Sequence, residues 1–439
     1  MRIVLAIGFL CLNFSALADT ATKVDIHLVK TAAEKWQLSY LLSAPAKRLA
    51  FVRNPDNSRT IRWQPMSSAF HIIQQDGNEF IVRKDSEPFS DVSVLLTPTY
   101  KHLSKDYAPF SPYSNKGALI HTGRLFACAN ACADDENHWK ISMQAPKGQH
   151  MVVHGVIHTE VVHWVDKDDG INVYVGTQKP IETDNVIAIV DESLPEKINT
   201  SLEADIPALM DYFEQRLGKL KGSKPMLFAS YANVDGHSSQ GGTLPNQIFM
   251  HWNVNNLNEK VADEQFLNNT LWFFAHEVAH LYQRSNGNQL YGEQNESWLH
   301  EGNAEWLAAL ALLEMYPDTK PYVEARVNKA KQICNQGLRQ FPLTEAANNG
   351  RFDLYYQCGL LIHKTLDEAI KQNSEGKQDI FSLWRAYRDA LNSSVGEPNK
   401  GALFLRLAEQ KTSADLISKI KAFINAKANA DANNLKEKV

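Results

Sequence analysis

The hydrophobic pattern of this chain changes its period near residue 190. From about Val24 to Val190, apolar residues recur in short runs with a period of two, which is typical of half-buried β-strands. Beyond this point they recur every three or four residues, which is typical of amphipathic helices. The pattern predicts a multidomain chain with an N-terminal antiparallel β domain, an α+β domain and an α-helical C-terminal part. We place these parts at 19–190, 191–345 and 346–439.

Two Asp-Gly pairs predict hairpin turns in the β half, because Asp-Gly supplies the positive φ angles that a primed two-residue turn needs. Asp76-Gly77 separates strands expected at 70–75 and 79–83. By the same rule, Asp169-Gly170 is expected to join a long strand at 150–165 to a strand at 171–177.

The second half of the chain is expected to be mostly helical. A strand is predicted at 224–233, and residues 268 to 270 supply a cap for a buried helix. The predicted helices span 194–217, 269–284, 296–315, 321–340, 354–372 and 380–391, followed by two short ones and a polar tail.

Composition and charge exclude several classes of protein. Of 439 residues, 44% are hydrophobic and 22% charged, which is typical of a folded globular chain. The chain has 45 basic and 50 acidic residues, so it lacks the basic excess that would neutralise a phosphate backbone. We therefore expect no nucleic-acid partner.

Residues 1–18 have the features of an export signal. Arg2 precedes an apolar run from Ile3 to Leu12, and Ala16-Leu17-Ala18 has the small-x-small pattern of a cleavage site. The run is shorter than the ~20 residues of a spanning helix, so cleavage is favoured over a membrane anchor. We expect a periplasmic or secreted protein without stable membrane insertion.

Four cysteines follow the predicted signal, and an even number in an exported chain permits two disulfides. Three pairings are possible. The simplest joins neighbours along the sequence, Cys128 with Cys132 and Cys334 with Cys358.

The predicted helix at 269–284 contains His276-Glu277-Val278-Ala279-His280. Histidines four residues apart lie one above the other on a helix, so both imidazoles can bind a single cation. A zinc ion held in this way needs a third protein ligand and an open position for water, whose pKa the metal lowers. Glu277 is then the candidate base that takes the proton as the water attacks a carbonyl.

The following helix supplies a candidate for the third ligand. It includes the run Trp298-Leu299-His300-Glu301-Gly302-Asn303-Ala304-Glu305, in which Glu301 lies 21 positions after His280. That connection is long enough for the second helix to fold back on the first. Glu305, one turn later on the same face, is expected to accept the free N–H of a ligand histidine. The two segments predict one zinc ion bound by His276, His280 and Glu301.

HEVAH followed by WLHEGNAEW resembles the gluzincin metallopeptidases, which have a thermolysin-like catalytic domain. The likeness is greatest to the glycyl aminopeptidase and aminopeptidase N families, over about 225–365. It implies the same zinc ligands and Glu277 as the base. In those families a tyrosine three positions before a glycine on a later helix stabilises the oxyanion. The run Tyr355-Tyr356-Gln357-Cys358-Gly359 places Tyr356 there, with Tyr355 as the alternative.

The resemblance also implies a glycine-rich edge strand that binds the substrate backbone. Gly241, Gly242 and Thr243 occupy the corresponding place before the metal helix, where an extended peptide would add to the sheet. The aminopeptidases place an acidic residue in or beside this strand to bind the free α-amine. Here we find only Asn246 and Gln247.

From these features we expect an exported, aminopeptidase-like zinc metallopeptidase that cleaves a peptide or protein substrate. The alternative is a non-catalytic relative that binds a peptide or protein on the same scaffold. A zinc hydrolase of non-peptide substrates is a third hypothesis, because the same water attacks any suitably placed carbonyl.

Overall fold

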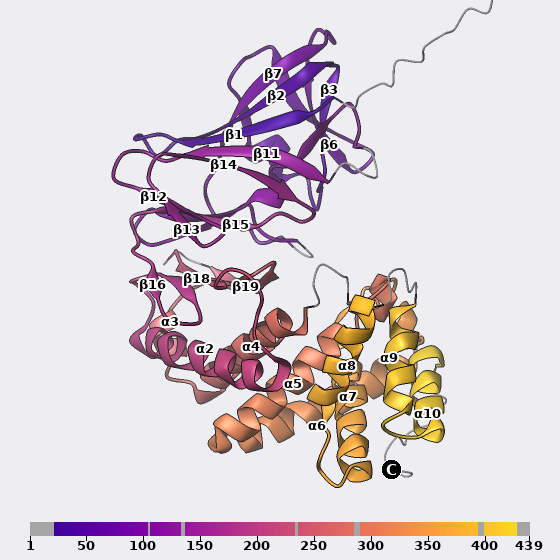
Figure 1. Ribbon diagram of the computed structural model, residues 1–439. Helices are drawn as coiled ribbons and strands as arrows, with labels where there is room; N and C mark the ends of the chain where they lie inside the picture. The colour runs from indigo at the N-terminus through magenta and orange to yellow at the C-terminus, as the bar shows by residue number, and fades with distance from the viewer. Residues whose placement is uncertain are drawn as a thin grey trace, which may run out of the picture. The chain divides into compact units, whose positions relative to one another are not determined.

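The computed structural model describes residues 22–103, 106–132, 137–232, 236–284, 290–393 and 399–427. The export signal predicted at 1–18 lies outside these residues, as does most of the polar tail. Strands make up the N-terminal part of the chain and helices the C-terminal part (Figure 1).

The chain divides into two compact units. The first comprises Met1–Thr97, Leu125–Gln144 and His163–Asp168, and the second comprises Pro98–Arg124, Ala145–Val162 and Asp169–Val439. The second unit thus includes segments within 19–190. The domain boundaries at 190 and 345 stay predictions.

Two sheets make up the strands of the first unit, and only the first two residues of β14 fall in the second unit. The strands of one sheet are β1 (Val24–Lys30), β2 (Trp36–Ala46), β4 (Gln64–Pro65), β7 (Phe89–Leu96), β11 (His138–Gln144) and β14 (Val161–Lys167). Those of the other are β3 (Arg48–Phe51), β5 (Phe70–Gln75), β6 (Asn78–Arg83) and β10 (Ala127–Ala129), with a short helix α1 (Ser58–Arg62) nearby in sequence. The strand orders are β14-β11-β1-β2-β7-β4 and β10-β3-β6-β5.

The first unit departs from the predicted antiparallel arrangement at one pair, since β1 runs parallel to β11. A long connection separates these strands, so no hairpin fixes their relative direction. The hairpin at Asp76-Gly77 is confirmed, because β5 and β6 pair antiparallel around φ angles of 51° and 79° at these two residues.

The hairpin predicted at Asp169-Gly170 is wrong. The flanking strands belong to different sheets, and the predicted long strand turns instead at His154-Gly155, with φ angles of 50° and 80°. The positive φ of Gly170 serves another purpose. A β carbon there would lie 2.3 Å from the backbone nitrogen of Gly123, so only glycine fits this close approach.

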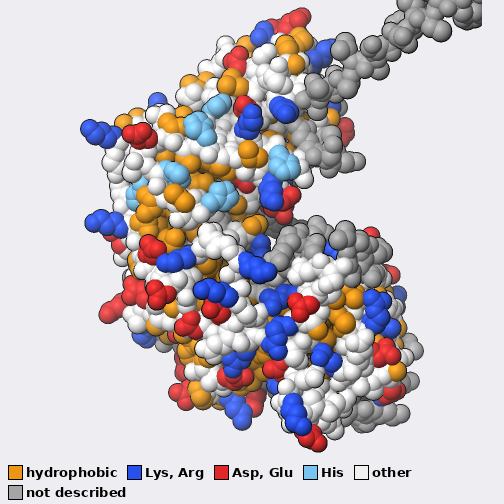
Figure 2. Space-filling view, viewed as in Figure 1, with side chains coloured by type: hydrophobic (Ala, Val, Ile, Leu, Met, Phe, Trp, Pro, Cys, Tyr) orange, Lys and Arg blue, Asp and Glu red, His pale blue; other side chains and the backbone are white. Residues whose placement is uncertain are grey.

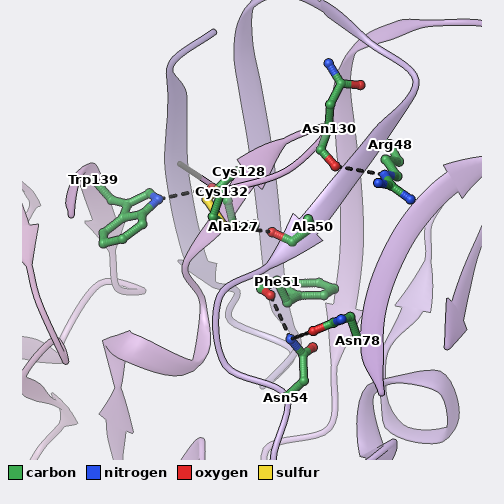
Figure 3. Close-up of a disulfide and its surroundings, with 10 residues drawn as sticks. All are labelled: Arg48, Ala50, Phe51, Asn54, Asn78, Ala127, Cys128, Asn130, Cys132 and Trp139. Atoms are coloured by element: carbon green, nitrogen blue, oxygen red, sulfur yellow. Dashed lines mark hydrogen bonds between the residues drawn. A yellow bond between two sulfur atoms is a disulfide. The ribbon is translucent and has the colours of Figure 1, made fainter. Parts of the chain in front are cut away.

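Both disulfides join the sequence neighbours named above. Figure 3 shows Cys128–Cys132 at the end of β10, where Trp139 donates a hydrogen bond to the carbonyl oxygen of Ala127 at 3.1 Å. The second bridge, Cys334–Cys358, joins two helices of the second unit.

The second unit contains two further sheets. The strands of one are β8 (Phe110–Pro112), β9 (Ala118–His121), β12 (His150–Val153), β13 (Val156–His158) and β15 (Asn172–Gly176). Those of the other are β16 (Ile181–Glu182), β17 (Ile187–Val190), β18 (Met226–Tyr231), β19 (His237–Leu244) and β20 (Gln247–Val254). In the second of these sheets β17, β18 and β20 are parallel, and β19 is an antiparallel edge strand.

The β16–β20 sheet is covered on both faces within the second unit. On one face, Phe228 and Phe249 pack with two tyrosines of the other sheet of this unit. These are Tyr174 on β15 and Tyr113, which directly follows β8. Its other face packs against helices through residues such as Trp252. The helices are α2 (Glu196–Leu217), α3 (Leu257–Lys260), α4 (Glu264–Gln283), α5 (His300–Met315), α6 (Lys320–Leu338), α7 (Asp353–Asn373), α8 (Ile380–Ser393), α9 (Lys400–Glu409) and α10 (Ala414–Asn425).

Most of these helices lie close to their predicted positions, but α3 was not predicted and α4 begins earlier than expected. α4 begins before residue 269, because Asp263 is its cap and accepts a hydrogen bond from the backbone N–H of Gln265. On the face shown in Figure 2, acidic and basic side chains are interspersed over the helical part. In the portion of the chain that the structure describes, we find no helix with the length and apolar character of a membrane span.

Candidate metal centre

The structure brings the three predicted zinc ligands together. His276 and His280 lie one turn apart on α4, and Glu301 lies in the first turn of α5. The two Nε2 atoms are 2.9 Å apart. Oε2 of Glu301 lies 3.3 Å from Nε2 of His276 and 3.1 Å from Nε2 of His280. Three ligand atoms therefore converge on one point.

Both supporting helices are held by the core. The apolar side chains of Phe274, Val278 and Leu281 on α4 are buried. On α5, buried residues run without interruption from Gly302 to Leu312, which is typical of an internal helix. Packing thus fixes both helices, and Glu301 at the start of α5 meets the two histidines on α4.

Glu305, one turn beyond Glu301, faces His276. Nδ1 of His276 lies 3.1 Å from Oε1 of Glu305, at an angle short of a well-aligned hydrogen bond. Trp272 donates to the same oxygen at 3.0 Å, and Arg326 donates to the other oxygen at 3.4 Å. The Arg326 guanidinium also lies over the Trp272 ring, 4.3 Å from its centre. Glu305 is therefore fixed from three sides.

His280 is oriented by Gln283, a residue that the sequence analysis did not identify. Nδ1 of His280 lies 2.8 Å from Oε1 of Gln283. The amide nitrogen of Gln283 donates to Oδ1 of Asn303 at 2.8 Å and to the His300 carbonyl at 2.9 Å. Gln283 is fully buried and links α4 to α5. The available signal was its position three residues after His280, one turn along the helix.

The donor set fits a zinc ion. A neutral imidazole with its proton on Nδ1, the atom that faces an oxygen in each histidine, would direct the lone pair of Nε2 to the centre, where the oxygen of Glu301 joins them. Zinc is bound by such nitrogen and oxygen atoms at ~2.1 Å, which for a tetrahedral ion places ligand atoms ~3.4 Å apart. The distances of 2.9 to 3.3 Å are close to this spacing.

The electrostatics of the cluster favour a cation. Burial lowers the pKa of His276, but the carboxylates of Glu301 and Glu305 outweigh it and raise this pKa to about 10. Burial raises the pKa of Glu301, yet the adjacent histidines bring it well below its usual range. Ionised carboxylates beside two imidazoles stabilise positive charge at the point where the ligand atoms meet.

Glu277 lies beside the ligands and contacts the edge strand. The hydroxyl of Thr243 on β19 donates to Oε2 of Glu277 at 2.6 Å. The same hydroxyl lies 3.0 Å from the backbone carbonyl of Glu277. Thr243 therefore ties the edge strand to the metal helix and orients the carboxylate.

The two glycines before Thr243 make room for aromatic rings. A β carbon on Gly241 would lie 2.4 Å from the Phe273 ring on α4. Gly242 is the next residue along the strand and therefore faces the opposite side. A β carbon on it would lie 2.8 Å from the Tyr107 hydroxyl. The strand is glycine-rich because aromatic side chains pack closely on both of its faces.

Tyr356 lies next to the ligands and Tyr355 does not. The ring of Tyr356 stacks on His276, with centres 5.7 Å apart. Burial and the charges of Glu301 and Glu277 raise the pKa of Tyr356, which keeps its hydroxyl protonated. Tyr355 is fully buried, and its hydroxyl accepts a hydrogen bond from the backbone N–H of Ala347 at 3.3 Å.

Comparison with known proteins shows the fold. No protein-family model matches this sequence, and no curated protein matches it. An aminopeptidase N family protein from Idiomarina loihiensis matches with a TM-score of 0.67 and 11% identity, over 92% of this chain and 76% of that chain. A mutant M1 zinc metallopeptidase from Deinococcus radiodurans, bound to a Tyr-Ser-Ala substrate, matches with a TM-score of 0.56 and 13% identity, over 94% and 96%.

Native yeast LTA4 hydrolase matches with a TM-score of 0.53 and 12% identity, over 94% of this chain and 68% of that chain. At these identities the likeness establishes a shared architecture, with a β-sheet N-terminal region and a helical C-terminal part. This chain therefore has the fold found in M1 zinc metallopeptidases.

Proposed function

We propose that this protein is a zinc metallopeptidase in which His276, His280 and Glu301 bind the metal and Glu277 is the general base. The observation that carries the proposal is the convergence of two Nε2 atoms and one carboxylate oxygen within 4.8 Å, beside a further buried glutamate. The likeness of the fold to M1 zinc metallopeptidases supports the same activity. In solved structures of that fold, one such enzyme holds a Tyr-Ser-Ala substrate.

When bound, zinc supplies a Lewis acid that polarises a carbonyl and lowers the pKa of water. Glu277 accepts the proton of the attacking water through the carboxylate oxygen that Thr243 leaves free. Glu305 and Gln283 hold the two imidazoles in the tautomer that binds metal. Tyr356, protonated and stacked on His276, donates a hydrogen bond to the oxyanion that develops.

The edge strand β19 gives a peptide a place to bind in extended form. Gly241, Gly242 and Thr243 lie at the sheet edge nearest Glu277, so a substrate paired with them would pass the base. A thermolysin-like catalytic domain at 191–345 is part of the proposal. So is an aminopeptidase-like mode of cleavage, as in the proteins of similar fold.

We further propose that the protein is exported and functions in the periplasm or outside the cell. The sequence pattern at 1–18 supports export. The two disulfides also support it, because such bridges persist in oxidising compartments.

The test is digestion of a mixed peptide library by the purified, zinc-loaded protein, with cleavage positions identified by mass spectrometry. We expect cleavage that a chelator abolishes and added zinc restores. Full zinc loading with every peptide left intact would defeat the peptidase proposal. Peptide binding in that case would support the non-catalytic alternative.

A further inference from the structure

A buried chain of polar side chains leads from Gln283 on α4 to a histidine on α7. Nε2 of Gln283 donates to Oδ1 of Asn303 on α5 at 2.8 Å. Nδ2 of Asn303 in turn lies 3.4 Å from Nδ1 of His363 on α7. Gln283, Asn303 and His363 are each 0% exposed. The chain therefore joins three helices inside the core of the second unit.

The hydrogen bonds of this chain have one consistent direction. Because Oδ1 of Asn303 accepts from Gln283, the NH2 group of Asn303 faces His363 and can only donate. Nδ1 of His363 must then accept, which places the proton of a neutral ring on Nε2. If the Asn303 amide were reversed, its NH2 group would face that of Gln283. A buried donor of each amide would then lose its acceptor, which is costly.

The surroundings keep the His363 ring neutral. Burial lowers the pKa of His363 to about 3, although the backbone groups of Leu299 and Trp298 act in the opposite direction. The ring packs beside Phe404, with ring centres 5.3 Å apart. A neutral ring has a lone pair on one nitrogen, so His363 can accept from Asn303 at neutral pH.

The other end of the chain meets the metal ligand His280. Gln283 donates from its amide nitrogen to Asn303 and to the His300 carbonyl, which leaves its oxygen to face His280. That oxygen lies 2.8 Å from Nδ1 of His280. Because an amide oxygen can only accept, a neutral His280 that donates to it has the lone pair on Nε2, the atom nearest Glu301.

The face of α7 that carries His363 also carries the proposed oxyanion donor. Tyr356, Gly359 and His363 are separated by three and four residues, so they lie along one side of the helix. That side faces α5, because Gly359 meets Gly302 and His363 meets Asn303. One helix face thus supports the proposed site at two places.

We propose that His363 is a positioning residue for the metal ligand His280, an inference that rests on the proposed zinc-dependent function. His363 accepts from Asn303, and the amide held in this way gives Gln283 one of its acceptors. Gln283 in turn faces His280 with the oxygen that favours the metal-binding tautomer. His363 therefore acts on the ligand through two amides and from a third helix.

Two substitutions at His363 separate positioning from packing. His363→Phe keeps an aromatic ring but removes the acceptor, whereas His363→Asn keeps an acceptor near the place of Nδ1 but removes the ring. By competition with a chromophoric chelator, we expect zinc affinity to fall ~3- to 10-fold in His363→Phe and less than ~2-fold in His363→Asn. Thermal stability should show the opposite order, because only His363→Asn loses the ring packed beside Phe404. Wild-type zinc affinity in His363→Phe, or a greater loss in His363→Asn, would overturn the proposal.

Two controls show whether the effect passes along the chain. His251→Phe makes the same change at a fully buried histidine of β20, whose Nδ1 lies 2.8 Å from the Ser230 hydroxyl, and should leave zinc affinity unchanged. In a Gln283→Leu background the chain is already broken, so His363→Phe should lower zinc affinity no further. An equal loss with and without Gln283 would show that His363 acts by another route and would overturn the proposal.

A neutron crystal structure of the wild-type chain tests the inference without any variant. We expect hydrogen on Nε2 of His363, none on its Nδ1, and the NH2 group of Asn303 facing it. Hydrogen on Nδ1 of His363 would overturn the proposal even if both His363 variants fail to fold. If the wild type binds no zinc, the proposed function fails, and the neutron structure still decides the direction of the chain. If the wild type binds zinc but His363→Phe binds it equally well, the inference fails and the proposed function stands.

Discussion

A β carbon on Gly302 would lie 2.2 Å from the α carbon of Gly359, so α5 and α7 cross with their backbones in contact. Glu301 directly precedes Gly302, and Tyr356 lies three residues before Gly359. The crossing therefore sets the separation between the third proposed ligand and the tyrosine on α7. Glycine is needed at both positions, after Glu301 and three residues after Tyr356, because a β carbon on either would collide with the other helix.

Gly359→Ala is expected to force α5 and α7 apart. Overpacking of this kind lowers the free energy of unfolding by ~1 to 3 kcal/mol, and movement of Glu301 weakens zinc binding. Urea unfolding and zinc titration measure the two effects. Glu368→Ala, at an exposed position on α7, is the control and should change stability by less than ~0.5 kcal/mol. A Gly359→Ala variant as stable as this control would show that the crossing has room for a methyl group.

Glu305→Gln is expected to weaken zinc affinity ~10-fold or more without unfolding the protein. The amide keeps the shape and still accepts from Trp272, but it lacks the charge that favours a metal-bound His276. A competition titration with a chromophoric chelator measures the effect. Glu314→Gln, exposed on the same helix, should leave affinity unchanged. Equal affinities of the two variants would remove Glu305 from the metal site.

Gln283→Leu is expected to lower zinc affinity by a similar ~10-fold, because it removes the acceptor that orients His280. It also breaks the link to Asn303, so a loss of thermal stability should accompany the loss of affinity. Gln265→Leu, exposed in the first turn of α4, provides the matched control. Unaltered metal binding in Gln283→Leu would mean that packing alone orients His280.

The ligand cluster could be predicted because its geometry is local. Two histidines four apart must share a face of a helix, and a Glu-Gly pair on the next helix needs only a return of the chain. The spacing of Gln283 from His280 is local, but its link to Asn303 on another helix is not, and that link could not be predicted. The contact of Thr243 with Glu277 likewise depends on how the sheet packs on α4. Sequence spacing carries no information about either contact.

The positions of the helices could also be predicted from the sequence, but the pairing of distant strands could not. Periodicity placed the helices, since burial of one face is a local property. The failed hairpin shows the limit: Gly170 has the positive φ of a turn residue, but it serves close packing against Gly123. The parallel pairing of β1 with β11 was equally out of reach, because strands far apart in sequence carry no turn that reveals their direction.

Tyr356→Phe is expected to lower kcat by ~100- to 1,000-fold with little change in KM, because one donor to the developing oxyanion is lost. Zinc content should stay close to the wild-type level, because the three proposed ligands remain and the Tyr356 ring still stacks on His276, although the hydroxyl that neighbours Glu301 is lost. Tyr355→Phe is the matched control, because its hydroxyl faces Ala347 in the core. Steady-state kinetics on one peptide compares the two. A larger loss of kcat in Tyr355→Phe would reverse the assignment.

The most direct test of the account is turnover and zinc content measured on the same preparation of Glu277→Gln. The amide keeps the shape of the side chain and still accepts the Thr243 hydroxyl, but it cannot take a proton from water. We predict one zinc ion per chain, as in the wild type, and peptide turnover reduced by at least ~100-fold. A zinc-loaded Glu277→Gln variant that cleaves peptides at the wild-type rate would contradict the account.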